Sequence, residues 1–264
     1  MKIISQKNKN RIEKIFLGNT NLEKTASRPY YETQKQNLKS IWNNTKYNDF
    51  GVERLLRIFL QLLAWPLPSG ILRSLTGSDN FLTRRLSIEI LVIAKLIFYY
   101  FVLKFDYTSN FTILVIAFVL TCDTIYFSIS RIMLNDLYRK HVSYTRSLLL
   151  TFLNYIEVCL FFAILYLYID YTRSEAFIIN ENIQLTVNGH LSSIQAIYFS
   201  FITAATIGYG DISPKDPFAM KIVVIQTIVS LFFVIVFLTN VINQLGKNTF
   251  YNQVKNTEEE NNPT

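Results

Sequence analysis

The feature that most constrains the fold is the stretch Thr203–Asp211, with the sequence TAATIGYGD. An apolar segment precedes it, and a long apolar segment follows it at close spacing. Non-helical backbone is tolerated at membrane depth only where protein buries it or where it lines a water-filled space. Gly208 and Gly210 can adopt the positive φ angles that turn successive carbonyls toward one axis. We therefore expect a loop of aligned carbonyls between two membrane-embedded helices.

This stretch resembles the selectivity-filter signature of the potassium-channel pore-domain superfamily. It differs from the TVGYG form only by Ile207, which has a shape similar to that of Val. The alternative is a Gly-Tyr-Gly turn in an unrelated loop, and the flanking apolar helices favour the filter. The resemblance is to a bacterial-type two-helix pore domain preceded by an extra transmembrane hairpin. It covers about Ser147 to Gly246 and says nothing about residues 1–86.

The resemblance implies that backbone carbonyls coordinate potassium ions in place of water. The expected filter residues are Thr206, Ile207, Gly208, Tyr209 and Gly210. The K⁺ ligands among them are the carbonyls of the first four and the Thr206 hydroxyl. One chain supplies one filter strand, so the reading requires a homotetramer, or a close paralogue as co-subunit, around a central pore.

Residues next to the filter are expected to support it. By the resemblance, Asp211 leans toward the Tyr198 hydroxyl, and Phe199 is assigned to the same support. Ile202 occupies the position where some family members have a glutamate behind the filter. Ser192 or Ser193 can cap the short pore helix, which continues to Ala205 and aims the negative end of its dipole at the pore.

Composition and charge predict an all-α membrane protein. Half of the 264 residues are hydrophobic, and the mean hydropathy is positive. Four transmembrane helices are expected, with a re-entrant pore helix and filter loop before the last of them; they span about 86–105, 111–130, 147–169 and 218–245. Residues 1–85 contain fifteen Lys and Arg against six Asp and Glu. Positive-inside bias therefore places both termini in the cytoplasm of a multi-pass protein of the cell membrane, plasma or bacterial inner.

Five regions follow from this topology. They are a basic cytoplasmic N-terminal region (1–85), a two-helix hairpin (86–130), a basic cytoplasmic linker (131–146), the pore domain (147–246) and a short cytoplasmic tail (247–264). Residues 55–75 are apolar but contain Arg57, Gln61 and Pro66, so we expect an interfacial helix near 55–65 rather than a span. Residues 1–54 show no clear periodicity. No signal peptide is expected, because residues 1–45 lack an apolar core.

Polar residues in the last span are gating candidates. Ser230 lies twenty residues after Gly210, where many family members have a hinge glycine, and its hydroxyl can bond back to the Gln226 carbonyl. Candidates for lining the inner pore are Thr239, Asn240 and Asn243, next to Gln244. The alternative for these residues is hydrogen bonding between packed helices.

Three charges fall inside predicted spans, at Lys95, Asp123 and Glu157. Their similar depths predict an ion pair between Lys95 and Asp123, and a structural role is favoured over a functional one.

His190 can sense external acid, but a solvated surface histidine is the favoured interpretation. Cys122 and Cys159 are expected to be buried thiols without a disulfide or metal pattern.

The sequence therefore predicts a potassium-selective channel that is not strongly voltage-gated. The expected partners are K⁺ as the permeant ion, membrane lipid, identical subunits and an unidentified cytoplasmic regulator. No cofactor, enzymatic activity or nucleic-acid partner is expected. Two alternatives are a subunit of a potassium-uptake transporter and a membrane sensor with a non-conducting pore. An intact single filter argues against the first, and the absence of a catalytic motif argues against an enzyme.

Overall fold

The computed structural model describes residues 30–43, 51–75, 81–134, 144–173, 175–179 and 190–245. The chain forms two compact units, Met1–Leu91 and Val92–Thr264. Each unit is described by itself below.

The first unit contains three short helices and the beginning of a longer one. They are α2 (Tyr30–Trp42), α3 (Gly51–Leu63), α4 (Pro68–Leu75) and α5 (Phe81–Lys104), the last of which continues into the second unit. Proline at the first position of α4 suits a helix start, because that position needs no N–H donor. Tyr31 meets the Trp65 ring edge-on at 6.1 Å. Helix α3 covers most of residues 55–65, where the sequence predicts an interfacial helix. The sequence showed no periodicity for α2, because this helix is mostly polar and packs only against α3 and α4.

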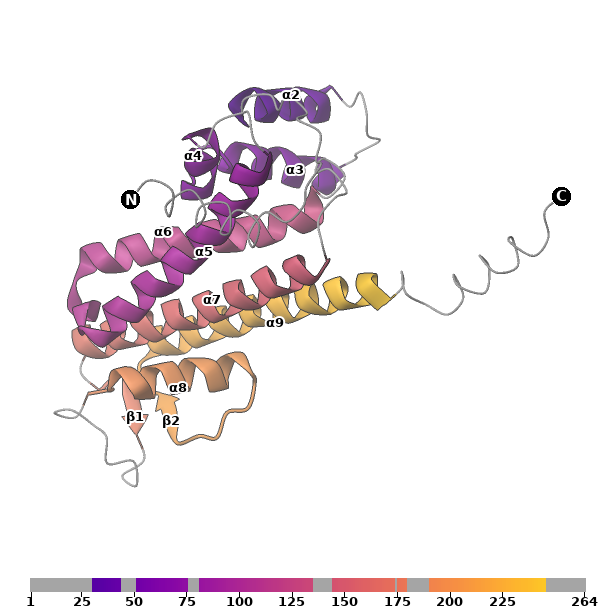
Figure 1. Cartoon of the computed structure of the whole chain (residues 1–264). Coiled ribbons are helices and arrows are strands. Elements are labelled where there is room, and N and C mark those ends of the chain that lie inside the picture. The colour runs from indigo at the N-terminus through magenta and orange to yellow at the C-terminus, as the bar shows by residue number, and fades with distance from the viewer. Residues whose placement is uncertain are drawn as a thin grey trace, which may run out of the picture. The chain divides into compact units, whose positions relative to one another are not determined.

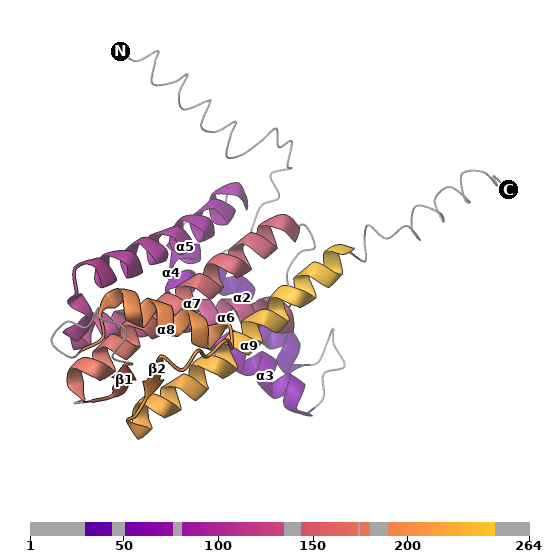
Figure 2. The ribbon, with the colours of Figure 1, turned by 90° about the horizontal axis from the view of Figure 1, so that it is seen from below.

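The second unit is built around α7. After α5 come η1 (Tyr107–Ser109), α6 (Phe111–Met133), α7 (Tyr144–Thr172), β1 (Phe177–Ile179), α8 (Ser193–Ala204), β2 (Ile212–Pro214) and α9 (Pro217–Leu245). Helix α7 packs against α6, α8 and α9 (Figures 1 and 2). The η1 turn lies in the predicted loop between the hairpin helices, and Asn110 caps α6 by accepting from Thr112 N at 2.9 Å.

Aromatic side chains fill the core between α7, α8 and β1. Tyr166 packs edge-on against Phe177 at 5.6 Å and against Phe199 at 5.0 Å. Close packing of these rings stabilises the unit through van der Waals contacts. This cluster fixes α8 against α7 and so determines where the segment after α8 begins.

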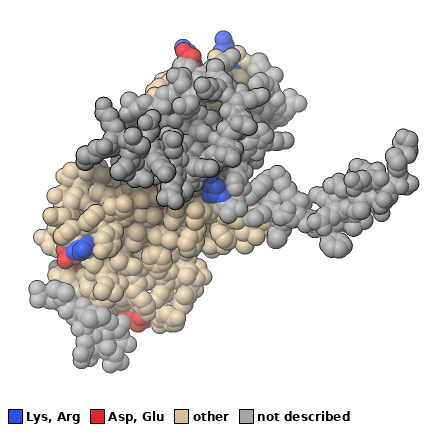
Figure 3. All heavy atoms as spheres, viewed as in Figure 1, with Lys and Arg blue, Asp and Glu red and all other residues tan. Residues whose placement is uncertain are grey.

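Three helices are long and apolar enough to cross a membrane, within Phe111–Ser130, Arg146–Thr172 and Pro217–Ile242. They match the second, third and fourth predicted spans. On the face shown in Figure 3, the described surface of the second unit has few charged side chains. The first predicted span, about 86–105, is helical as part of α5 but is not among these three. Its described part includes the charged residues Glu89, Lys95 and Lys104.

A small sheet departs from the predicted all-helical fold. Strands β1 and β2 pair antiparallel, with Phe177 opposite Pro214 and Ile179 opposite Ile212. The sequence analysis took β1 as part of a polar external loop. The prediction missed it because three apolar residues are too few for a strand pattern, and only the pairing with β2 defines it.

Candidate functional site

The pore helix predicted from the sequence is α8, and a capping box begins it. Gln195 N donates to the Ser192 side chain at 3.3 Å, and Ser192 N donates to Gln195 Oε1 at 2.8 Å. Ser192 is therefore the cap that the sequence left open between two serines. The Ser193 hydroxyl instead lies 2.8 Å from Asp106 Oδ1 and 3.1 Å from the Leu103 carbonyl. These contacts join the start of α8 to the turn between α5 and α6.

The segment after α8 has an alternating backbone. Positive φ angles occur at Thr206 (58°), Gly208 (59°) and Gly210 (80°), whereas Ile207 and Tyr209 between them have none. When left-handed and right-handed backbone conformations alternate along a chain, successive peptide groups can face the same way, with N–H groups on one side and carbonyls on the other. A Cβ at Gly208 or Gly210 would meet no atom within 4 Å, so backbone conformation is the reason for glycine within one chain. The positive φ of the two glycines is as predicted, and that of Thr206 is new.

A backbone hydrogen bond ties the start of this segment to α8. At its start, Ile207 N donates to the Ile202 carbonyl at 3.0 Å, so Ile202 contributes backbone rather than a polar side chain. The chain then runs back alongside α8 to β2 (Figure 1). Residues 205–210 are exposed within the single chain, with Ile207 at 53% and Tyr209 at 69%.

Asp211 holds the far end of the segment. Its carboxylate accepts from the Tyr198 hydroxyl, as the sequence predicts, and from Ile212 N at 3.0 Å. The Tyr198 phenol is the donor in this hydrogen bond. Phe199 is buried against Tyr166, as described above, and supports the helix from its opposite side.

A buried hydrogen-bond network that the sequence analysis missed ties α8 to α7 and α9. Gln226 Nε2 donates to the Ser200 carbonyl at 2.8 Å and to Ser200 Oγ at 2.9 Å. The Tyr166 hydroxyl donates to Gln226 Oε1, and Ser200 Oγ donates to the Cys159 carbonyl at 2.7 Å. All four residues are fully buried. The available signal was the presence of Ser200 and Gln226 in otherwise apolar helices.

The predicted gating residues lie on α9, and the structure shows the hydrogen bonding of three of them within the chain. The Ser230 hydroxyl is buried without a hydrogen-bond partner among the described residues, so the expected bond to Gln226 is not formed. Asn240 was an inner-pore candidate, but Ser147 on α7 donates to its Oδ1 at 3.2 Å. Its amide therefore joins two helices of one chain, which is the alternative reading. The Thr239 hydroxyl donates to its own helix, at the Ile235 carbonyl. The side chain of Asn243 lies outside the described residues.

The predicted ion pair is confirmed and is part of a larger cluster. Lys95 Nζ lies 2.9 Å from Asp123 Oδ2 and 3.7 Å from Glu157 Oε1, and all three side chains are buried. Thr124 accepts from Lys95 at 2.8 Å and donates to Glu157 Oε1 at 2.7 Å. This charged cluster (Lys95, Asp123, Thr124 and Glu157) links α5 and α6 to α7. In the described part of the chain, no group of His, Cys, Asp and Glu residues is arranged to hold a metal ion.

Polar contacts link the residues just before α8 to the end of α7. Asp170 Oδ2 accepts from Leu191 N at 2.8 Å and lies 3.2 Å from His190 Nδ1. His190 is exposed, as expected for a surface histidine. Lys215 pairs with Glu175 and lowers the pKa of that carboxyl, first by hydrogen bonding and then by its charge. The Lys215–Glu175 contact lies at the end of the β1–β2 pair where Phe177 faces Pro214.

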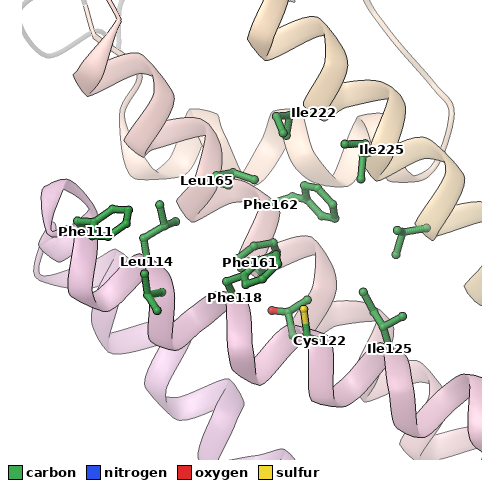
Figure 4. Close-up of a pocket in the computed structure, with 13 residues that line it drawn as sticks. Phe111, Leu114, Phe118, Cys122, Ile125, Phe161, Phe162, Leu165, Ile222 and Ile225 are labelled. Atoms are coloured by element: carbon green, nitrogen blue, oxygen red, sulfur yellow. The ribbon is translucent and has the colours of Figure 1, made fainter. Parts of the chain in front are cut away.

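An apolar groove lies between α6, α7 and α9 (Figure 4). Its volume is about 370 Å³, and its lining residues all fall within the three apolar spans. Its walls are mainly aliphatic and aromatic and include Phe118 on α6 and Phe161 and Phe162 on α7. Cys122, predicted to be buried, is half-buried at this groove, while Cys159 is fully buried, and both are free thiols.

Comparisons with known proteins identify part of the chain. Residues 155–247, less than half of its length, match the family model described as "Ion channel". The match covers most of the predicted pore domain (147–246) and confirms the resemblance to the potassium-channel pore-domain superfamily for this segment. Neither the curated proteins nor the solved structures give a match. Together with the three apolar helices, the family match indicates a membrane protein with an ion-channel domain.

Proposed function

We propose that four copies of this chain form a potassium-selective channel that conducts K⁺ passively across the cell membrane. Residues 206–210 form the filter, and the carbonyls of Thr206, Ile207, Gly208 and Tyr209 coordinate the ion. No enzymatic step or cofactor is part of this function. The proposal starts from the ion-channel family match of residues 155–247.

The observation that supports potassium most directly is the alternating backbone of the filter segment. Positive φ occurs at Thr206, Gly208 and Gly210, and this alternation allows successive carbonyls to face one axis. Rings of such carbonyls replace the hydration shell of K⁺. The C-terminus of α8 lies at the start of this segment, and its partial negative charge favours a cation there.

The fourfold assembly follows from the incompleteness of one chain. The filter segment and large apolar side chains such as Ile207 and Tyr209 are exposed in the single subunit. One strand cannot surround an ion, whereas four strands about an axis enclose it and bury this surface. Mass measurement of the conducting form in detergent should therefore give a tetramer, and a conducting monomer or dimer would exclude this arrangement.

A fourth membrane crossing by α5 completes the proposed topology. Its 24 residues are about 36 Å long at 1.5 Å per residue, which is enough to cross the hydrocarbon core. Lys95 in this helix is paired with Asp123, and pairing lowers the cost of burying a charge in a membrane. With four crossings and a re-entrant α8, both termini lie in the cytoplasm.

Reversal potentials in mixed K⁺ and Na⁺ test the function on the protein reconstituted in a planar bilayer. The wild type should strongly prefer K⁺. Tyr209→Asp should bring the permeability ratio toward one, because it removes an aromatic ring next to the filter and adds charge at its mouth. Tyr107→Asp is the matched control, since Tyr107 is equally an exposed tyrosine but lies in the α5–α6 turn.

The alternatives give different recordings. A subunit of a potassium-uptake transporter shows transport without sustained single-channel currents. A membrane sensor with a non-conducting pore shows neither. Equal permeability to K⁺ and Na⁺ in the wild type would contradict potassium selectivity while leaving the ion-channel assignment in place.

A further inference from the structure

Helix α3 turns its apolar side outward. Six of its residues are large, apolar and exposed: Val52, Leu55, Leu56, Phe59, Leu62 and Leu63. At 3.6 residues per turn, these positions fall within a single arc of roughly 120°. We call this arc the α3 apolar face. An amphipathic helix of a water-soluble domain normally turns such an arc toward the core.

The polar side of the same helix is turned inward. Gln61 is only 2% exposed. Arg54 donates to the Trp42 carbonyl at the end of α2, and Arg57 pairs with Glu53 at 3.1 Å along α3. The folded unit therefore packs the polar side against its own residues and leaves the α3 apolar face uncovered among the described residues. A contiguous exposed apolar face of this kind marks a binding surface.

Three observations identify a membrane surface as the partner. First, the same chain contains three helices that can cross a bilayer, so a bilayer is always close to this unit. Second, both tryptophans of the chain, Trp42 and Trp65, belong to this unit and are exposed, and tryptophan prefers the headgroup level. Third, the fifteen Lys and Arg against six Asp and Glu in residues 1–85 favour an anionic leaflet.

We propose that α3 lies on an anionic phospholipid leaflet with its apolar face inserted. Interfacial helices of this type bury their apolar side about 5–10 Å into the boundary between headgroups and acyl chains. The docked helix anchors the N-terminal unit to the membrane independently of which ion the pore conducts.

The two native tryptophans provide the test, because they report on this unit alone. The full chain is reconstituted in phosphatidylcholine–phosphatidylglycerol vesicles whose lipids have bromine either near the headgroup end or near the terminus of the acyl chain. Bromine quenches tryptophan on contact, so shallow bromine should quench more strongly than deep bromine. Trp42→Phe assigns the remaining signal to Trp65, which follows α3 directly.

Paired variants link the quenching to the α3 apolar face. Leu55→Gln with Phe59→Gln should shift α3 toward the undocked state by about tenfold for each side chain, since each loses the burial of one large apolar group. Leu55→Met with Phe59→Leu is the matched control and should keep the wild-type quenching. Both positions are exposed, so the helicity measured by circular dichroism should stay unchanged in either pair.

The following outcomes of the quenching experiment would overturn the proposal. Equal quenching in the glutamine pair and the wild type would show that the apolar face does not hold the unit on the lipid. A water-soluble quencher, acrylamide, provides a further check. If neither acrylamide nor the bromolipids quenched the tryptophans, protein such as residues 1–29 or a second copy of the chain would cover the face instead of lipid. Replacing phosphatidylglycerol by phosphatidylcholine alone should weaken shallow quenching, and unchanged quenching would contradict the anionic preference.

Discussion

At the scale of single residues, Gln226 deserves the most direct test. Its carboxamide is fully buried and bonds with Tyr166 and Ser200, so it joins the middle of α9 to the last turn of the pore helix. The filter segment begins only a few residues after Ser200. The position of the filter carbonyls thus depends on a hydrogen-bond network that lies behind α8.

Gln226→Leu should destabilise the protein by about 1–3 kcal/mol, because it leaves the Tyr166 hydroxyl without its acceptor in an apolar interior. The cost should fall when Tyr166→Phe is added, since this removes the orphaned hydroxyl. Thermal unfolding in detergent measures both effects. Thr227→Val is the control, because the Thr227 hydroxyl bonds only to Val223 of its own helix. Strictly additive effects of the two substitutions would mean that the residues are not coupled.

At the scale of secondary-structure elements, the charged cluster connects the α5–α6 hairpin to α7. With both carboxyl groups ionised, Lys95 balances one negative charge, and Asp123 is its nearer partner. Glu157 Oε2 has no hydrogen-bond partner among the described residues. Substitutions of Lys95 and of Glu157 should therefore differ in cost according to which charge they leave unbalanced.

Lys95→Met should be the most destabilising, by about 3–5 kcal/mol, because it strands two buried carboxylates. Glu157→Gln should cost least, since the Lys95–Asp123 pair remains balanced. Thermal unfolding of the detergent-solubilised protein ranks the variants. Lys104→Met, at the exposed end of the same helix, is the control. If Glu157→Gln cost as much as Lys95→Met, Glu157 rather than Asp123 would be the main counter-ion.

At the scale of the whole molecule, the distribution of charge bears on gating. Steep voltage dependence requires about three or four charges per subunit, each worth about 2.3 kcal/mol per 100 mV. The span Phe111–Ser130 contains no Lys or Arg, and Lys95 in α5 is held by Asp123. The hairpin therefore lacks a set of movable charges within the residues that the structure describes.

We expect the open probability of the wild-type protein, alone in a bilayer, to change only weakly with voltage. Single-channel recordings over a wide voltage range measure this directly. Asp123→Asn offers an internal comparison, because it loosens the hold on Lys95 and should increase any voltage dependence that this charge provides. A wild-type curve that rises steeply within a few tens of millivolts would require a voltage sensor elsewhere in the chain.

The sequence alone determined what depends on local chemistry. Long apolar segments predicted the helices α6, α7 and α9, and the serines before the pore helix predicted its cap. The glycines of TIGYG predicted the positive φ angles because only glycine adopts them at little cost. The pairing of Lys95 with Asp123 was also predictable, since a membrane interior forces buried charges together.

Tertiary structure alone decided which polar side chains meet. The sequence left Asn240 open between pore lining and bonding to a packed helix, and its bond to α7 appears only in the structure, because helical spacing gives a residue's face but not its partner. The Gln226 network and the β1–β2 pair join residues separated by tens of positions, and no local pattern encodes such pairs. The sequence predicted an interfacial helix near 55–65, but not which of its side chains are exposed. Amphipathic periodicity predicts two faces, and only the packing of α2 against α3 decides which face stays exposed.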